Sequence, residues 1–516
     1  MHRSGFPFLV AVETMRSKKA IWNVVANLFQ QLVAIVYGFI IPKIIISHFG
    51  SEVNGLISSI TQFLGYIVLL ESGFGPVVKA ALYKPLAKKD SQQISNILFA
   101  STRFFRRISY IFIAYLLGLT FFYPIIVDTG FDFIFVASMV LITSISTFAE
   151  YYFGMAYRLF LQADQKGYIV SIIQAVSYIL SLVLVVILAK LNAPVHIIKL
   201  ATVLTFILRP ILQNFYVRKK YQINLANADK QYNIKQKWDG LAQHVASVVH
   251  NNTDVVVLTL FSSLAEVSIY SVYSLVLTGV KNLVQAATNG LSSGFGDMIA
   301  KEEYKTLNKR FNSYEVIYCT IATIVYVCAL LLIVPFVQAY MNGVTDANYT
   351  QWTFGILITL AEFVWAIRLP YSSTTLAAGH FKETHIGAWV EAGVNIVLSV
   401  ILVWNFGLVG VAIGTLVAMI VRTVEFIYHT NKYILKRSIW ATINKLVVLV
   451  IESLTIVFIA RFIPISEMTS YLNWIIYALE IFAVAVLVVL PANYLLFKED
   501  FKDILRTLRR VFKRKK

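Results

Sequence analysis

The chain has 516 residues, of which 58% are hydrophobic and 14% are charged, and its mean hydropathy is +0.70. A soluble domain carries about one quarter charged residues, so this composition excludes a soluble globular protein. The formal net charge of +18 is compatible with nucleic-acid binding, but the positions of the basic residues, described below, exclude that class.

Apolar runs of about 20 residues recur along the whole chain, and each is long enough to cross a bilayer core as a helix. Several contain Gly or Pro, which membrane helices tolerate when neighbouring groups satisfy the backbone. The sequence therefore predicts an all-α polytopic membrane protein with about 14 transmembrane helices. The predicted segments are 22–41, 54–74, 108–127, 131–153, 168–189, 196–216, 240–262, 267–298, 314–336, 352–376, 386–404, 407–428, 442–462 and 472–497.

An internal repeat relates the two halves of the chain. Thr147-Phe148-Ala149-Glu150-Tyr151 is followed 212 residues later by Thr359-Leu360-Ala361-Glu362-Phe363. Within four residues of this offset, the other pairs are Trp22 and Trp238, Glu52-Val53 and Glu266-Val267, Arg209 and Arg422, and Lys220-Tyr221 and Lys432-Tyr433. Such a repeat in an apolar chain is typical of a transporter built from two similar halves.

Each repeat contains six predicted helices, so both halves enter the membrane in the same sense and the repeat is parallel. We expect two parallel six-helix bundles followed by two additional C-terminal helices. The predicted regions are a cytoplasmic N-terminus (1–19), an N-terminal bundle (20–216), a polar cytoplasmic linker (217–237), a C-terminal bundle (238–430), helices 13 and 14 (431–497) and a basic amphipathic tail (498–516).

Basic residues are concentrated in alternate loops, which hold 36 of the 45 Lys and Arg residues. The opposite loops contain only Lys43, Lys190, Lys199 and Arg461. By the positive-inside rule, both termini are expected in the cytoplasm, and the excess charge reflects topology and contact with anionic lipids. Residues 77–107 carry Arg103, Arg106 and Arg107; we interpret this basic loop as a surface helix or a lipid-headgroup contact.

Polar side chains follow helical spacing in three predicted membrane segments, which indicates either a water-accessible cavity or hydrogen bonds between helices. We favour a cavity, with Gln30 and Gln285 as substrate-contacting members. The three sets are Asn23, Asn27, Gln30 and Tyr37; Gln243, Ser247, His250 and Asp254; and Tyr270, Ser274, Thr278, Lys281, Gln285, Thr288 and Ser292.

Four of the five basic residues that remain inside predicted membrane helices are candidates for substrate binding, because an ionised group there is costly unless it faces a cavity or a partner. They are Lys281, Arg209, Arg368 and Arg422. Cations that line a cavity suit an anionic ligand, and Arg can bind phosphate through two parallel hydrogen bonds. The alternative is ion pairing, between Arg422 and Glu425 or between Lys281 and Asp254.

His250 and Asp254 lie four residues apart on one helix face and are candidates for a proton or cation site that couples transport. A hydrogen bond that holds two helices together is the alternative. The repeated acids Glu150 and Glu362 are expected to brace helices rather than to contact substrate.

Several sequence features argue against catalysis. The chain lacks a P-loop motif, a nucleophile elbow and any His/Cys/Asp cluster with metal-ligand spacing, and its outer loops are short. Cys319 and Cys328 are nine residues apart in one predicted helix and cannot form a local disulfide. We expect no catalytic residues, no metal and no cofactor.

Four motifs resemble those of the polysaccharide-repeat-unit (Wzx-type) flippases of the MATE-like (MOP) superfamily. They are Gly50-Ser51-Glu52-Val53-Asn54-Gly55-Leu56; Asn251-Asn252-Thr253-Asp254-Val255-Val256; Ala378-Gly379-His380-Phe381-Lys382 with Asn395-Ile396-Val397-Leu398-Ser399; and Gly407-Leu408-Val409-Gly410-Val411-Ala412-Ile413-Gly414-Thr415. The resemblance covers essentially the whole chain. The drug exporters of that superfamily carry an acidic residue in helix 1. This chain differs from them, because the polar residues of its first predicted helix include the amides Asn23, Asn27, Gln30 and Gln31 and no acid.

The resemblance implies two bundles around a cavity that opens alternately to each side of a bacterial cytoplasmic membrane. It implies a lipid-linked oligosaccharide of the undecaprenyl-pyrophosphate type as substrate, for capsule, exopolysaccharide or O-antigen assembly. A polysaccharide polymerase and glycosyltransferases are the implied partners, with no nucleic acid. The alternative function is an ion-coupled small-molecule exporter of the MATE-like or major-facilitator type.

Overall fold

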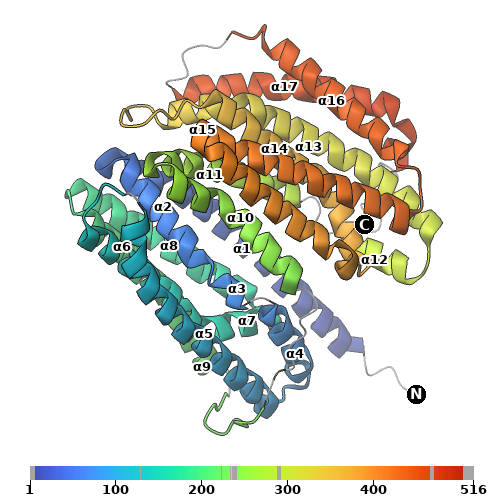
Figure 1. Cartoon of the computed structure of the whole chain (residues 1–516). Helices are drawn as coiled ribbons and strands as arrows, with labels where there is room; N and C mark the ends of the chain where they lie inside the picture. The colour runs from blue at the N-terminus through green and yellow to red at the C-terminus, as the bar shows by residue number, and fades with distance from the viewer. Residues whose placement is uncertain are drawn as a thin grey trace, which may run out of the picture. The chain divides into compact units, whose positions relative to one another are not determined.

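A computed structural model of the chain describes residues 6–71, 73–127, 129–221, 223–232, 234, 241–286, 292–464 and 470–503. Within these ranges, the side chains of residues 6–18, 20, 241–244, 247, 250, 251, 286, 292 and 293 lie outside the description. Every regular element in the described ranges is a helix (Figure 1). Twelve helical segments there are long and apolar enough to span a membrane, which confirms the all-α polytopic fold class.

The chain forms two compact units, Met1–Val248 and Val249–Lys516. The first contains α1 (Phe6–Phe49), α2 (Ser51–Gly65), α3 (Val68–Glu71), α4 (Phe74–Lys88), α5 (Ser91–Ile126), α6 (Phe133–Ala149), the π-helical turn η1 (Glu150–Gly154), α7 (Met155–Ala163), α8 (Gly167–Lys190) and α9 (Val195–Lys220). Then come α10 (Leu241–Phe261), which crosses the boundary, α11 (Leu264–Ala286), α12 (Ser292–Ala300), α13 (Tyr304–Tyr340), α14 (Trp352–Ala377), α15 (Phe381–His429), the π-helical turn η2 (Thr430–Leu435), α16 (Trp440–Ala460) and α17 (Tyr471–Leu496).

Several helices extend beyond the apolar segments that predicted them. α5 begins at Ser91 rather than at residue 108 because Asp90 caps it, with Oδ1 accepting a hydrogen bond from the backbone N–H of Gln93 at 2.9 Å. The basic segment 77–107 is therefore helical, divided between α4 and α5. Apolar content identifies the part of a helix inside the membrane, whereas the caps decide where the helix begins.

Two predicted membrane segments do not correspond to single helices in the structure. The segment 131–153 continues through η1 into α7, so the helical run extends to Ala163. The segment 267–298 corresponds to α11 and α12, and residues 287–291 between them lie outside the described ranges.

α15 contains two predicted membrane segments joined at a kink. Gly407 lies at the kink with φ 51° and ψ −128°, a backbone conformation that side-chain-bearing residues rarely adopt. Beyond it, Gly410 and Gly414 face the first half of α15, where added Cβ atoms would come within 2.4 Å of the Leu402 carbonyl oxygen and 2.3 Å of Ser399 Oγ. This small-xxx-small pair allows the two halves of α15 to pack backbone against backbone.

The order of packing is the same in both units. In the first unit α5 packs on α6 and α6 packs on α9, and in the second α13 packs on α14 and α14 packs on α15. α16 and α17 pack on each other and on α13 (Figure 1).

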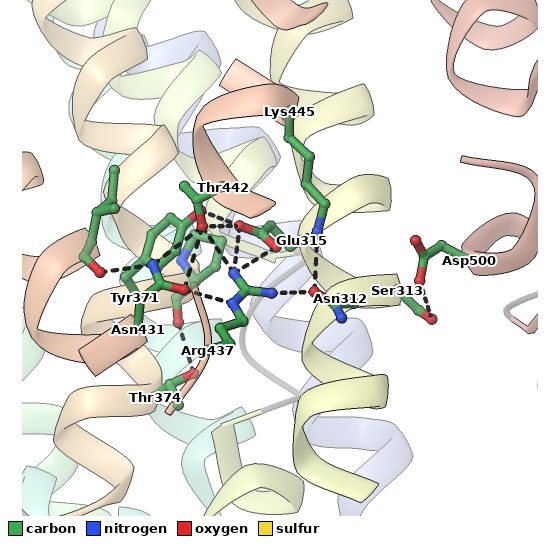
Figure 2. Close-up of polar contacts among 12 residues, drawn as sticks. Asn312, Ser313, Glu315, Tyr371, Thr374, Asn431, Arg437, Thr442, Lys445 and Asp500 are labelled. Carbon is green, nitrogen blue, oxygen red and sulfur yellow. Dashed lines mark hydrogen bonds and ion pairs between the residues drawn. The ribbon is translucent and has the colours of Figure 1, made fainter. Parts of the chain in front are cut away.

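A buried ion cluster attaches α16 to α13 (Figure 2). Glu315 on α13 is fully buried and accepts hydrogen bonds from Arg437 Nη2 at 2.9 and 3.0 Å and from Lys445 Nζ at 2.5 Å. Tyr371 of α14 and Thr442 of α16 also donate to this carboxylate. Glu315 compensates one of the two positive charges, and the remaining donors of Arg437 and Lys445 bond the amide oxygens of Asn312 and Asn431. The cluster thereby connects three helices.

Candidate functional site

A polar pocket of about 340 Å³ lies among α1, α7 and α8 in the first unit. Three of the four polar residues predicted on one side of the first membrane helix line it, namely Asn23, Asn27 and Gln30. The other lining residues are Arg158, Leu159, Gln162, Gly167, Val170, Ser171 and Gln174. We call this the amide pocket, because most of its polar groups are carboxamides, each of which can donate and accept hydrogen bonds.

Hydrogen bonds and an ion pair fix the walls of the amide pocket. Asn23 accepts a hydrogen bond from the backbone N–H of Tyr168 at 2.7 Å and donates to the Gln165 carbonyl at 2.9 Å, which ties α1 to the start of α8. Arg158 lies 3.0 Å from Glu150. The arginine that lines the pocket is therefore held by one of the two repeated acids.

Arg209 lies on α9 against a group of aromatic side chains. Its guanidinium carbon is 3.8 Å from the ring centre of Phe206 and 4.4 Å from that of Tyr178, positions that suit cation–π attraction. Nε and Nη2 are buried and have no hydrogen-bond partner among the described residues. These two N–H groups can bind an anion, because a guanidinium presents its donors as a planar fork.

Close packing at Gly154 brings α9 against η1. A Cβ at Gly154 would lie 2.6 Å from Cβ of Pro210 and 3.2 Å from Oε2 of Glu150. Only glycine allows this approach, which places Arg209 and Glu150 on adjoining elements.

In the second unit, Lys281 pairs with Glu362 rather than with Asp254, the partner considered from sequence. Lys281 Nζ lies 3.0 Å from Glu362 Oε2 and 4.1 Å from the ring centre of Trp365. The pair connects α11 with α14 and offsets a charge that hydrocarbon disfavours.

Arg368 and Arg422 share the carboxylate of Glu391. Arg368 Nη1 is 2.6 Å from Glu391 Oε1, and Arg422 Nε is 3.6 Å from Oε2. Arg422 also bonds Glu425 at 2.5 Å, the i,i+3 ion pair that was the alternative considered from sequence, and donates to the Thr384 carbonyl at 2.8 Å. Two cations and two carboxylates thus form one largely compensated cluster on α14 and the two halves of α15.

The carboxylate of Asp254 is buried among neutral hydroxyl and amide groups. Tyr270 donates to it at 2.8 Å, Asn395 at 3.2 Å and Thr415 at 2.8 Å. Asn395 Oδ1 and Ser399 Oγ are buried and have no hydrogen-bond partner within the described part of the chain. Hard cations prefer oxygen ligands of these kinds, so the cluster can hold a proton or a small hard cation.

This oxygen cluster contains a single carboxylate. The described residues contain no group of three or more His, Cys, Asp or Glu side chains placed to hold a metal ion. His250, the other predicted coupling residue, lies outside the residues whose side chains are described. Gln285 lies on α11 with an exposed side chain.

Glu391, Asn395 and Thr415 are site residues that the sequence did not single out. Asn395 and Thr415 lie in the motifs that carry the family resemblance, but nothing in their local spacing shows that they meet. Asn395 and Thr415 come together because the kink at Gly407 folds the second half of α15 back on the first.

Solved structures provide the comparison with known proteins, since no protein-family model and no curated protein matches the chain in sequence. The lipid II flippase MurJ in an inward closed conformation superposes with a TM-score of 0.69 at 17% identity, over 93% of this chain and 99% of that one. A multidrug resistance MATE transporter in an inward-facing conformation gives 0.61 at 13% identity, over 80% of this chain and 98% of that one.

A MOP superfamily transporter from Pyrococcus furiosus gives a TM-score of 0.50 at 11% identity, over 82% of this chain and 97% of that one. All three similar proteins are transporters or flippases rather than enzymes. The chain is therefore a multi-pass integral membrane protein with the helical fold shared by the MurJ lipid II flippase and the MATE transporters of the MOP superfamily.

Proposed function

We propose that this protein moves lipid-pyrophosphate-linked oligosaccharides from the inner to the outer leaflet by alternating access, for the assembly of a surface polysaccharide. The observation that carries the proposal is the amide pocket, lined by Asn23, Asn27, Gln30, Gln162 and Gln174. Sugar hydroxyls both donate and accept hydrogen bonds, and carboxamides match both roles. The lining includes Arg158 and no carboxylate, which favours a neutral or anionic ligand over a cationic drug.

Arg209 supplies a binding group for the pyrophosphate in this proposal. Its buried Nε and Nη2 donors have no partner among the residues that the structure describes, and guanidinium groups bind phosphate oxygens strongly. Lys281, Arg368 and Arg422 have carboxylate partners in this conformation. In the proposal they engage the phosphate when the bundles 20–216 and 238–430 rearrange during transport and these ion pairs open.

The extent of the structural likeness supports a flippase over an exporter. The MurJ structure covers 93% of the chain, whereas the inward-facing MATE structure covers 80%. The additional coverage is about the length of the segment that contains α16 and α17, the two helices that we predict to lie outside the repeat. In this proposal, the protein resides in a bacterial cytoplasmic membrane with both termini in the cytoplasm and works beside glycosyltransferases and a polymerase.

An ion-coupled exporter of small molecules is the second candidate, and the Asp254 cluster is the observation that favours it. A buried carboxylate surrounded by Tyr270, Asn395 and Thr415 suits a coupling cation or proton. The same cluster also serves a flippase that is driven by an ion gradient, so it does not by itself select the exporter.

A binding experiment separates the two candidates. The purified protein in lipid nanodiscs is titrated with a polyprenyl-pyrophosphate-linked disaccharide, with the sugar-free polyprenyl pyrophosphate or with ethidium, and its thermal unfolding is recorded. We expect the disaccharide-bearing lipid to raise the unfolding temperature most, because a ligand that binds only the folded state stabilises it. Stabilisation by ethidium alone would select the exporter.

Two neighbouring glutamines give the matched control. Gln30 lines the amide pocket, whereas Gln31 is exposed on α1 and does not. Gln30→Ala should weaken the added stabilisation that the sugars give, and Gln31→Ala should leave it unchanged. Equal effects of the two substitutions would remove the amide pocket from the proposal.

A further inference from the structure

Two cationic pockets lie beside each other in the first unit, apart from the amide pocket. One, of about 330 Å³, is lined by Thr102, Arg106, Asn214 and Arg218 with aromatic and aliphatic neighbours. The other, of about 400 Å³, is lined by Thr102, Arg103, Arg106 and Arg107. Because they share Thr102 and Arg106, we treat them as one site and call it the α5–α9 basic site.

The charge of this site is not compensated by acidic side chains. Neither pocket has a carboxylate in its lining. Within the described ranges, Arg106, Arg107 and Arg218 form no ion pair; Arg106 lies over the ring of Tyr152 at 4.9 Å. Thr102 Oγ1 and Asn214 Oδ1 are buried there without a hydrogen-bond partner. Arginines with an unsatisfied hydroxyl are the groups that bind a phosphate.

The position of the site along its helices favours a phosphate that belongs to a lipid. Arg103, Arg106 and Arg107 directly precede the apolar stretch of α5, and Arg218 follows the apolar stretch of α9. Phe215 lines the site and is 63% exposed. Arginines at the end of an exposed apolar surface are placed as in the headgroup region of a membrane, where they attract anionic lipids.

The segment after α9 forms part of the wall. Leu225 lines the pocket, and Arg103 Nη1 donates to the Lys230 carbonyl at 2.7 Å. Gln92 donates to the Asn227 carbonyl at 2.9 Å, and Asn96 accepts from the backbone N–H of Asp229 at 2.8 Å. Residues 223–232 therefore lie along α5 as a strap, and Leu225 of this strap lines the site.

We propose that the α5–α9 basic site binds the phosphate of an anionic phospholipid headgroup, with the acyl chains along the apolar surface beside Phe215. A bound lipid would hold the strap of residues 223–232 against α5. The proposal concerns a resident lipid and is independent of the transported substrate.

Native mass spectrometry of the full chain in detergent tests the proposal. The wild type is titrated with phosphatidylglycerol and with phosphatidylcholine, which has the same phosphate but no net charge. Each arginine near a membrane surface contributes about 1 kcal/mol to binding of an anionic lipid, or about fivefold in affinity. Arg106→Gln/Arg218→Gln should therefore weaken phosphatidylglycerol binding about 25-fold and leave phosphatidylcholine binding unchanged.

Lys84→Gln/Lys88→Gln is the matched control, since it removes the same charge from exposed positions on α4 outside the site. It should retain wild-type affinity for phosphatidylglycerol; an equal loss would show general surface attraction and overturn the proposal. Inorganic phosphate and pyrophosphate form the third arm. Complete displacement of the lipid by either one would assign the site to a free anion instead. Arg106 and Arg218 are both exposed, and should the double variant not fold, Arg218→Gln alone should weaken binding about fivefold.

Discussion

The ammonium of Lys281 lies 3.0 Å from Oε2 of Glu362, and Glu362 is the repeat counterpart of Glu150. Both repeated acids hold a cation, since Glu150 pairs with Arg158 at 3.0 Å. The partners come from different places, α11 for Glu362 and α7 for Glu150. The repeat therefore supplies the acid in both units, while each unit supplies its cation separately.

Breaking the pair in α11 and α14 should destabilise the second unit. Lys281→Met leaves Glu362 without its ammonium partner, and because both side chains are about one fifth exposed, we expect a loss of about 1–2 kcal/mol, below the value for a fully buried pair. Lys281→Met/Glu362→Gln should recover most of it. The measurement is a double-mutant cycle of thermal unfolding in nanodiscs, and a coupling of Lys281 to Asp254 instead of Glu362 would contradict the observed pairing.

Lys281 and Arg368 are also predicted to act in transport. Lys281→Ala or Arg368→Ala in a polymer-producing strain should abolish surface polysaccharide even when polymer is normalised to the amount of the variant in the membrane. The physical reason is that each removes a cation that the proposed pyrophosphate requires. Lys301→Ala is the control, because Lys301 is 60% exposed in a surface pair with Asp297; unchanged polymer in both test strains would refute the substrate assignment.

The Asp254 cluster predicts a specific response to sodium. Replacing choline chloride by sodium chloride at equal ionic strength should raise the unfolding temperature of the wild type, since a cation bound only in the folded state stabilises it. Asp254→Asn and Asn395→Ala should abolish the shift. Ser453→Ala, which removes a hydroxyl that donates to the Leu449 carbonyl on α16, should retain it. A sodium response that survives Asp254→Asn would place the cation elsewhere.

Adding a side chain at Gly154 should lower the free energy of unfolding. Its added Cβ would meet Cβ of Pro210 at 2.6 Å, and the rigid proline ring cannot move aside, so Gly154→Ala should cost about 1–3 kcal/mol by overpacking. Gly118→Ala on α5 is the matched control, because nothing lies within 4 Å of its added Cβ. There we expect no loss, or a gain of up to about 1 kcal/mol from helix propensity. Equal unfolding temperatures for the two variants would contradict the close contact of α9 with η1.

Glu315 should be required for the attachment of α16. Glu315→Ala leaves the two cations Arg437 and Lys445 buried without their carboxylate, so we expect a loss of about 3–5 kcal/mol. Glu499→Ala should have little effect, because the Glu499 side chain is 87% exposed and its partner is the surface residue Lys502. Denaturant unfolding followed by tryptophan fluorescence measures both, and a small effect of Glu315→Ala would show that apolar packing alone holds α16 on α13.

The amino-acid sequence was sufficient to predict the all-α polytopic fold class. Hydrocarbon tolerates only segments that satisfy their own backbone hydrogen bonds, so apolar length alone predicts membrane helices. The helical spacing of Asn23, Asn27 and Gln30 likewise placed them on one side of α1, because side chains three and four residues apart lie on the same face. The i,i+3 pair of Arg422 and Glu425 followed from the same local geometry.

The pairing of charges and the meeting of oxygen atoms depend on tertiary packing and could not be predicted from sequence. Lys281 and Glu362 are 81 residues apart, and Asn395 reaches Thr415 because Gly407 breaks α15. Glu315 lies on α13, Lys445 on α16 and Arg437 in the connection before α16, and no repeat or motif relates them. These contacts depend on the packing of whole helices, and spacing within a single helix carries no information about that packing.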